Sequence, residues 1–259
     1  MPGRHVPPSL RTENLTIRFG GHAAVNGVTC AFQPGELTVI VGPNGAGKTT
    51  WFNLVSGQLK PTEGRIFKGD DDISALSPSA RAKGGVGRAF QLTNLFPKLT
   101  VLENVRLAVQ ASAGQGARIF TRAAGLTGIR EKAYGFVEAT RLAAVAHLPA
   151  SALPHGDQRK LEVALLMAME PDIFMFDEPT AGMSVDEAPA ILELVAELKK
   201  DRSKTILLVE HKMDVVRALA DRIVVLHNGE LVADGRPDEV MALPIVREIY
   251  LGVGAEEVA

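Results

Sequence analysis

The stretch ELTVIVGPNGAGKTTWFNLVSG, residues 36–57, decides the fold of this chain. It begins with a continuous apolar run, which is typical of a central parallel strand buried on both faces of a sheet. Residues 42–49, GPNGAGKT, then match the pattern G-x-x-x-x-G-K-[ST]. The segment after this loop indicates a helix that ends at Gly57. A glycine-rich loop between a buried strand and a helix is the setting of a phosphate-binding loop, so the stretch predicts an α/β nucleotide-binding core.

The residue types in this loop each meet a need of phosphate binding. Glycines let backbone N–H groups curl around phosphate oxygens, and the N-terminus of the following helix adds positive potential. Lys48 supplies a cation to the β- and γ-phosphates, and Thr49 offers a hydroxyl to Mg²⁺. We therefore expect ATP and Mg²⁺ as ligands. The residues expected to contact the nucleotide here are contiguous: Gly42, Pro43, Asn44, Gly45, Ala46, Gly47, Lys48, Thr49 and Thr50.

A second short segment, DIFMFDEP at residues 172–179, places two acids just beyond a very apolar strand. Asp177 can hold Mg²⁺ through water, and Glu178 can polarise the water that attacks the γ-phosphate. The alternative is that both acids only cap a helix or lie in a solvated turn. After a phosphate-binding loop, the catalytic interpretation is favoured.

The bulk properties exclude several classes of protein. The 259 residues carry a formal net charge of -2, so there is no overall basic excess and we expect no nucleic-acid partner. The single cysteine, Cys30, lies in an apolar stretch and is interpreted as a core residue in a reducing compartment. The N-terminus has no apolar leader segment, and no run of about eighteen apolar residues occurs. We expect a soluble protein that reaches a membrane only through a partner.

The order of predicted strands and helices alternates along the chain, which implies a mostly parallel sheet covered on both faces. Alternating apolar residues predict half-buried strands at 15–19 and 25–32, and Asn228-Gly229 predicts a hairpin turn. Residues 105–150 are rich in alanine with scattered arginine and glycine. Their periodic apolar residues favour a helical insertion, and a low-complexity linker is the alternative.

Taken in order, the motifs resemble those of an ABC-type ATP-binding subunit over nearly the whole chain. Phe19 stands where that family stacks an aromatic ring on adenine, and Gln91 matches its glutamine-loop residue. The stretch LPHGDQ, which contains Gly156, lies where its signature motif belongs. Asp186 matches its D-loop, and His211 matches its switch histidine. Taken alone, Phe19 could be a core residue, Gln91 a polar strand end and His211 a structural histidine.

The resemblance assigns roles to these residues. Gln91 would sense Mg²⁺ and the attacking water and connect to the membrane partner, and His211 would contact the γ-phosphate. Together with Glu178 and Lys48 they form the expected catalytic set. Gly156 and Asp186 would contact nucleotide as well. Thr49, Gln91 and Asp177 would form the metal site.

The same resemblance implies a P-loop NTPase core with a mostly parallel sheet, an antiparallel β subdomain and a helical subdomain. We expect one ABC ATPase domain over residues 1–259. Residues 1–91 and 167–259 would form the α/β core with the β subdomain and C-terminal helices. Residues 92–166 would form the helical subdomain.

Two stretches indicate which group within this family the chain resembles. RAFQLTNLFPKLTVLENV at 88–105 and VREIYLG at 246–252 are similar to the ATPase subunits of branched-chain amino-acid importers and their amide and urea relatives. Such importers combine two ATPase subunits, as a homo- or heterodimer, with two integral membrane permease subunits and an external solute-binding protein. This plan implies a cytoplasmic, peripheral place on the inner face of the cell membrane. The solute is selected by other subunits and cannot be read from this chain.

Two other kinds of ATPase are alternatives to a transport motor. ATPases of DNA repair or chromosome structure insert long coiled coils before the signature, whereas residues 92–152 are too few and too often broken by alanine and glycine for sustained heptads. A scaffold for metal-cluster assembly is the other alternative. One cysteine and no His/Cys cluster weaken it.

The signature departs from the family pattern at its second position. Pro154 stands where the family has serine, and proline offers neither a hydroxyl nor an N–H. The remaining donors are the N–H of Gly156 and the N-terminus of a helix predicted from Gln158 to about Met169. We expect Gly156 to be essential, Asp157 to point away from the phosphate, and His155 to face solvent or act as a third donor. Whether the segment is a working signature, a degenerate one or only a turn stays open.

The surface from Gln91 to Leu99 is the predicted docking site for a membrane subunit. Leu95, Phe96 and Leu99 lie in a predicted loop, where apolar side chains can mark a partner site. The alternative is that these residues fold back into the core.

Overall fold

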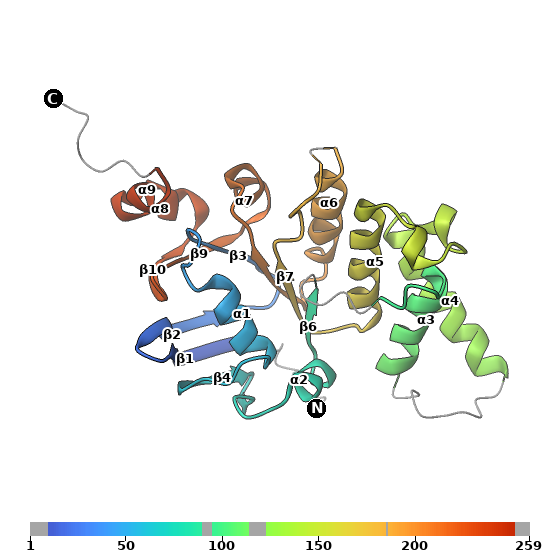
Figure 1. Ribbon diagram of the computed structural model, residues 1–259, viewed down its shortest axis with the longest axis horizontal. Coiled ribbons are helices and arrows are strands. Elements are labelled where there is room, and N and C mark those ends of the chain that lie inside the picture. The colour runs from blue at the N-terminus through green and yellow to red at the C-terminus, as the bar shows by residue number, and fades with distance from the viewer. Residues whose placement is uncertain (1–9, 90–94, 114–122, 185, 252–259) are drawn as a thin grey trace, which may run out of the picture.

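A computed structural model describes residues 10–89, 95–113, 123–184 and 186–251. Figure 1 shows a central sheet with one group of helices, α3 to α5, at one end of the molecule and the strands β1, β2 and β4 at the other. Among the described helices, none combines the length and apolar character that a membrane span needs.

The central sheet has six strands in the order β10-β9-β3-β8-β7-β6, and only the β9–β10 pair at one edge is antiparallel. Every residue of β3, β7 and β8 is buried, which is why these strands are continuous apolar runs in the sequence. The predicted parallel sheet is therefore confirmed. The strands are β3 (Leu37–Val41), β6 (Val86–Ala89), β7 (Ile173–Asp177), β8 (Thr205–Val209), β9 (Arg222–His227) and β10 (Glu230–Gly235).

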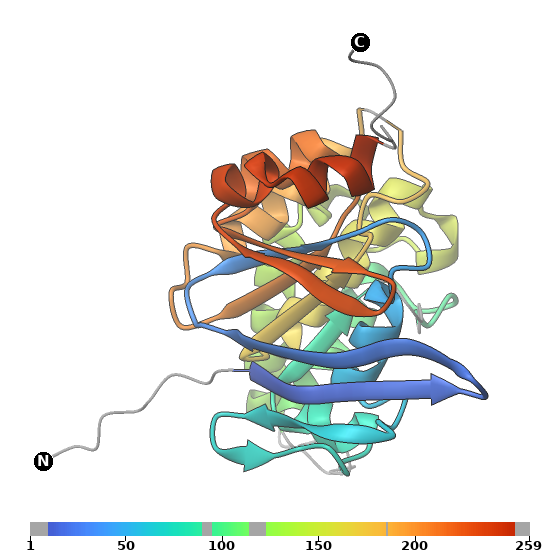
Figure 2. The same cartoon turned by 90° about the vertical axis from the view of Figure 1, so that its left-hand side faces the viewer.

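A second, antiparallel sheet has the order β2-β1-β4-β5 and confirms the expected β subdomain. Figure 2 shows this sheet lying across the molecule below the β9–β10 hairpin. Cys30 is buried in it, and burial raises the pKa of its thiol to about 12, so it is a core residue as expected. The strands are β1 (Leu10–Phe19), β2 (His22–Phe32), β4 (Glu63–Lys68) and β5 (Asp71–Asp72).

The helices divide between the two faces of the central sheet. Trp51 and Phe52 of α1 pack between the two sheets, in one core with Phe32 and Leu207. On the other face, residues of α5 to α9 pack against the sheet. These core helices are α1 (Lys48–Ser56), α2 (Pro78–Lys83), α6 (Ala188–Leu198), α7 (Met213–Leu219), α8 (Pro237–Ala242) and α9 (Pro244–Leu251).

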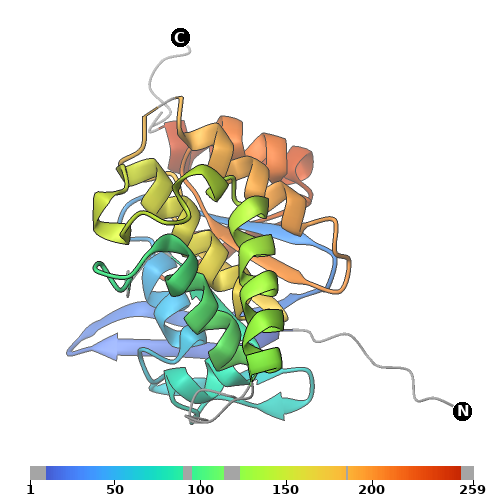
Figure 3. The ribbon, with the colours of Figure 1, turned by 90° about the vertical axis from the view of Figure 1, so that its right-hand side faces the viewer.

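The remaining helices form a separate cluster that Figure 3 shows face on. Their apolar residues share a core of their own, so the low-complexity alternative is wrong for the described parts of residues 105–150. Helix α5 belongs to two cores, because Leu161 packs in this cluster and Val163 against the central sheet. The elements are α3 (Val101–Ser112), α4 (Ala123–Ala139), the short η1 (Ala143–Val145) and η2 (Ala150–Ala152), and α5 (His155–Ala168).

Two helix starts differ from the sequence prediction. Helix α5 begins at His155 and not at Gln158, because the backbone of Pro154 has an extended conformation suited to the position before a helix. Ser184 and Glu187 have the spacing of a capping box, which predicts a helix that starts there, but helix α6 begins at Ala188, so Ser184 does not cap it. Ser184 and Glu187 still bond each other, since the Glu187 N–H donates to the Ser184 hydroxyl and that hydroxyl donates to the Glu187 carboxylate. The pair closes a turn before the helix.

Candidate nucleotide-binding site

The loop between β3 and α1 is shaped by glycines at two crowded points. Gly42 and Gly47 both have positive φ, and a Cβ on either would collide with a backbone carbonyl oxygen. For Gly42 that oxygen belongs to Leu226, and for Gly47 it belongs to Ala24 of β2. Only glycine fits such positions, so the loop packs closely against β9 and β2.

Lys48 bonds backbone carbonyls of the phosphate-binding loop that precedes it. Its ammonium donates to the carbonyl oxygens of Gly42, at 2.8 Å, and Pro43, at 2.9 Å. Burial lowers the pKa of Lys48, and the nearby carboxylates of Glu178 and Asp177 oppose that shift. An ammonium has three donors, so one remains for a phosphate oxygen.

The first turn of α1 is open to an anion. The first intrahelical bond runs from the Trp51 N–H to the Gly47 carbonyl, so the preceding N–H groups have no intrahelical acceptor. The turn has no side-chain cap and no acidic residue. Asn44, Gly45 and Thr49 are exposed at this end. Free N–H groups and the positive end of the helix dipole suit phosphate binding.

The two acids at the carboxyl end of β7 have different surroundings. Asp177 is buried, and its Oδ2 accepts a hydrogen bond of 2.6 Å from Arg88. Its Oδ1 is also buried and has no hydrogen-bond partner among the described residues. Glu178 is half-buried and has a φ of 50°, a conformation that costs roughly 1–3 kcal/mol in a residue other than glycine. Its N–H donates to Val209 of β8, which fixes this backbone turn.

Arg88 of β6 was missed by the sequence analysis. Its guanidinium bonds Asp177 on one side and Asn53 and Ser56 of α1 on the other. The stretch VGRAFQ, residues 86–91, is a strand candidate, and an arginine inside such a strand is the signal that could have identified Arg88, because a buried guanidinium needs partners.

Glu210 is a second residue that the sequence analysis missed. It is fully buried directly after β8, and its Oε1 accepts a hydrogen bond of 2.6 Å from the Thr180 hydroxyl. Its Oε2 accepts from the His211 backbone N–H at 3.1 Å. Glu210 therefore ties the segment after Glu178 to the segment that carries His211, whose own side chain is exposed.

The parallel sheet brings these groups to one edge. Val209 of β8 pairs with Ile40 of β3 on one side and with Asp177 of β7 on the other. The phosphate-binding loop, His211 and the two acids therefore leave the sheet at neighbouring carboxyl ends of strands, which is where open α/β sheets bind ligands.

The sequence matches the family model described as ABC transporter over residues 25–181. This chain belongs to the ABC transporter family. It is 39% identical over 252 residues to the high-affinity branched-chain amino acid transport ATP-binding protein LivG of Escherichia coli (strain K12), and the match covers 95% of this chain and 98% of LivG.

Solved structures of ABC transporter cassettes share the fold. The ADP conformation of one such ATP-binding cassette has a TM-score of 0.79 and 30% identity, and covers 95% of this chain and 99% of that one. A dimeric cassette in a post-hydrolysis state, bound to ADP and Pi, has a TM-score of 0.74 and 27% identity, and covers 88% and 98%. The chain is therefore an ATP-binding ATPase subunit of an ABC transporter, and its expected fold class is confirmed.

Phe19, which the ABC pattern singles out, lies in a hairpin next to the phosphate-binding loop. Phe19 is 52% exposed at the end of β1, so its interpretation as a core residue is wrong. It pairs with His22 in the same hairpin whose Ala24 contacts Gly47. Gln91 lies outside the described residues.

The segment that the sequence predicts as the signature forms a second group. Gly156 is buried in the first turn of α5, and a Cβ on it would lie 2.7 Å from Glu187 Oε1. Asp157 bonds Lys160 at 2.8 Å in its own helix, while Asp186 is exposed just before Glu187. This group sits on α5 and before α6, and is separate from the edge that carries Lys48.

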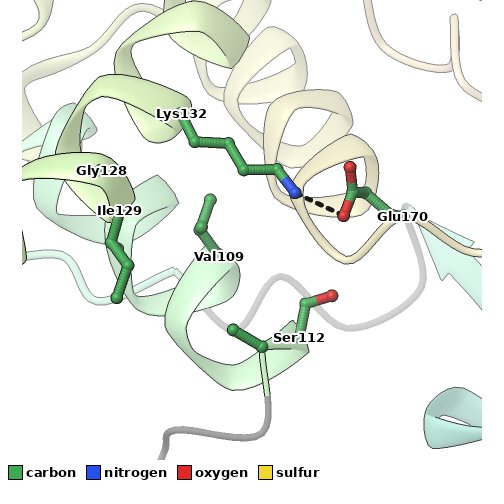
Figure 4. Close-up of a pocket in the computed structure, with 7 residues that line it drawn as sticks. Val109, Ser112, Gly128, Ile129, Lys132 and Glu170 are labelled. Carbon is green, nitrogen blue, oxygen red and sulfur yellow. Dashed lines mark hydrogen bonds and ion pairs between the residues drawn. The ribbon is translucent and has the colours of Figure 1, made fainter. Parts of the chain in front are cut away.

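Another concave site lies between α3, α4 and the end of α5 (Figure 4). Its one charged pair, Lys132 and Glu170, is bonded internally at 2.6 Å. None of the residues predicted to bind nucleotide lies in it, so it is not a candidate for that role. Its labelled lining residues are Val109, Ser112, Gly128, Ile129, Lys132 and Glu170.

Proposed function

We propose that this chain is the ATP-hydrolysing motor subunit of an importer for branched-chain or other hydrophobic amino acids. The similarity to LivG over 95% of this chain carries the proposal, because it extends beyond the nucleotide-binding motifs shared by many ATPases. In this function the chain binds ATP, dimerises and drives permease subunits on the inner face of the cell membrane.

The residues of the site fit ATP with Mg²⁺. Magnesium prefers oxygen ligands, which the Thr49 hydroxyl and the Asp177 carboxylate supply. The buried, unpartnered Oδ1 of Asp177 supports this assignment, since such an atom calls for a partner that the described residues do not provide. When bound, Mg²⁺ neutralises charge on the β- and γ-phosphates.

The protein groups divide the remaining work. Lys48 and the first-turn N–H groups of α1 bind and orient the phosphates. Glu178 orients the attacking water and accepts its proton at the side-chain carboxylate. Glu210 positions the segment of His211, which contacts the γ-phosphate. Phe19 is exposed and available to stack on the adenine.

The signature group completes the site of a second subunit. In this arrangement the Gly156 N–H and the N-terminus of α5 face the γ-phosphate bound to the opposite ATPase, with Asp186 beside them. The dimeric cassette bound to ADP and Pi supports a dimer as the working form. Asp157 is already paired with Lys160, which agrees with a side chain directed away from phosphate.

The permease docks on the loop around Phe96. This side chain is 55% exposed, so the alternative that these residues fold into the core is wrong for Phe96, whereas Leu95 is partly buried and packs against the core of the helical cluster. Buried Asn104 holds the loop, because its side chain donates to the Phe96 and Leu99 carbonyls and accepts from the Phe96 N–H. Leu148 is also exposed, and its backbone bonds Val101 beside this loop. An apolar side chain on a braced loop suits a docking surface.

Co-purification from the native membrane tests the proposal. A tagged chain should bring two integral membrane subunits and, where the pair is a heterodimer, a second ATPase. Uptake of radiolabelled leucine, urea and acetamide by vesicles holding that complex then identifies the solute. Recovery of the chain without membrane subunits, or with DNA-repair proteins, would contradict the proposed function.

A further inference from the structure

The ion pair between Arg88 and Asp177 is unusual in being both deeply buried and incompletely bonded. Each side chain is only 6% exposed, and Nη2 of Arg88 lies 2.6 Å from Oδ2 of Asp177. Yet Nε of Arg88 and Oδ1 of Asp177 are buried without a partner among the described residues. Because both charges lose their hydration on burial, such an ion pair contributes little to the stability of the folded protein. A different role therefore has to explain why the pair is present.

The other side of the guanidinium holds the helix of the phosphate-binding loop. Nη1 of Arg88 donates to Asn53 Oδ1 at 2.7 Å, to Ser56 Oγ at 3.0 Å and to Gln58 Oε1 at 3.3 Å. Asn53 and Ser56 belong to α1, which starts with Lys48 and Thr49. The Arg88 guanidinium also lies 5.4 Å from the centre of the Phe52 ring.

We infer that Arg88 is a positioning residue for the magnesium site. It joins the two segments that supply the proposed metal-binding oxygens, since it bonds Asp177 of β7 and also Asn53 and Ser56 of α1. Helix α1 carries Thr49 in its first turn. By occupying Oδ2, it leaves Oδ1 as the carboxylate oxygen free to serve the ion. This inference rests on the proposed function, in which Thr49 and Asp177 hold Mg²⁺.

The charge and the geometry of Arg88 act in opposite directions on a cation. A guanidinium beside Asp177 repels Mg²⁺, whereas its planar fork orients the carboxylate. The substitution Arg88→Lys separates the two effects because it keeps the charge and loses the fork. Loss of a residue that orients a metal ligand typically weakens metal binding about 10- to 100-fold.

The experiment measures binding of a fluorescent ATP analogue to purified protein, first in EDTA and then across a MgCl₂ titration. For Arg88→Lys, affinity in EDTA should stay at the wild-type value, while the half-saturating Mg²⁺ concentration should rise about 10- to 100-fold. The Mg²⁺ dependence of ATP hydrolysis should shift in parallel.

Arg81→Lys is the matched control. Arg81 is also buried, and its guanidinium donates to the Leu54 and Val55 carbonyls, at the same C-terminal end of α1 that Arg88 holds, and to the Ser74 carbonyl before α2. None of these hydrogen bonds of Arg81 involves a predicted metal-site residue. Its substitution should lower stability without moving the half-saturating Mg²⁺ concentration.

Asn53→Ala is a second variant that tests the role of Arg88. It removes one anchor of Arg88 on α1 and leaves the Asp177 pair in place, so the Mg²⁺ midpoint should rise by a smaller factor. Combined with Arg88→Lys, its effect should be less than additive in free energy, because both changes act on one network. If Arg88→Lys fails to fold, the Mg²⁺ midpoint of Asn53→Ala tests the inference in its place.

The outcomes separate the inference from the proposed function. A wild-type protein whose ATP binding and hydrolysis ignore Mg²⁺ would overturn the magnesium site itself. A Mg²⁺-dependent wild type together with wild-type midpoints in Arg88→Lys and Asn53→Ala would overturn only the role of Arg88. An equal shift in Arg81→Lys would also overturn it, because the effect would then be a general loss of packing around α1.

Discussion

The hydroxyl of Thr180 donates a hydrogen bond of 2.6 Å to the buried carboxylate of Glu210. Thr180 stands two residues after Glu178, and Glu210 directly precedes His211. The bond therefore links the segments that carry the proposed catalytic carboxylate and the proposed switch histidine.

Replacing Thr180 with valine should remove this link while keeping the shape of the side chain. Glu210 Oε1 then loses its hydroxyl donor in a buried site, so the free energy of unfolding in urea should fall by about 1–3 kcal/mol. Turnover should fall roughly 10- to 100-fold because His211 and Glu178 are held less accurately.

Thr38→Val is the matched control for that change. Thr38 is also buried, but its hydroxyl has no hydrogen-bond partner among the described residues. Removing an unpartnered hydroxyl should leave stability unchanged or raise it. Equal losses in both variants would show that the Thr180–Glu210 bond contributes nothing specific.

Glu178→Gln should bind ATP but hydrolyse it slowly. The amide cannot accept the proton of the attacking water, so turnover should drop by about 10²- to 10⁴-fold, while Lys48 and the loop still hold the nucleotide. Size-exclusion chromatography in MgATP should show long-lived dimers. Glu193→Gln, an exposed acid on α6, serves as the control. Wild-type turnover by Glu178→Gln would remove this residue from the mechanism.

Phe96→Asp should leave the protein folded and able to bind ATP, because this side chain is exposed. A charge on the docking loop should weaken contact with the permease, so the reconstituted complex should hydrolyse ATP without matching solute uptake. Leu76→Asp changes another exposed apolar residue and should transport normally. Full transport by stable Phe96→Asp protein would reject docking at this loop.

Gly156→Asp should block the ATP-bound dimer. The new carboxylate would face the phosphate of the opposite subunit, and its Cβ would crowd Glu187 within its own chain. Dimerisation in MgATP is the measurement. Gly128→Ala, a helical glycine with open space around it, is the control and should be neutral or stabilising. Normal dimers of Gly156→Asp would mean that the segment is only a turn.

Pro154→Ser should keep ATPase activity or raise it modestly. Pro154 is exposed ahead of α5, where a serine could also cap the helix. A restored hydrogen bond to a charged phosphate is worth roughly 1.5–3 kcal/mol, which limits the expected gain to about two orders of magnitude. An increase beyond that range would identify the natural signature as degenerate, with a partner ATPase supplying the working one.

The parts of the site that are local in the chain could be predicted from the sequence alone. The phosphate-binding loop, the strand before it and the helix after it are contiguous, so their pattern identifies them without knowledge of the fold. The apolar run that ends in Asp177 and Glu178 is local in the same way. Strands buried on both faces leave continuous apolar runs, which is why the parallel sheet could also be predicted.

The residues that hold those groups in place became identifiable only in the folded protein. Arg88 meets Asp177, and Glu210 meets Thr180, because neighbouring parallel strands bring together segments that lie far apart in the chain. Sequence periodicity indicates burial but does not identify the partner of a buried charge. The alternation of apolar residues along β1 likewise did not reveal that Phe19 is exposed. The packing of β1 against the core ends before that residue. Motifs made of neighbouring residues can be recognised from the sequence. Hydrogen bonds between strands depend on strand order and register, which form only when the whole core packs.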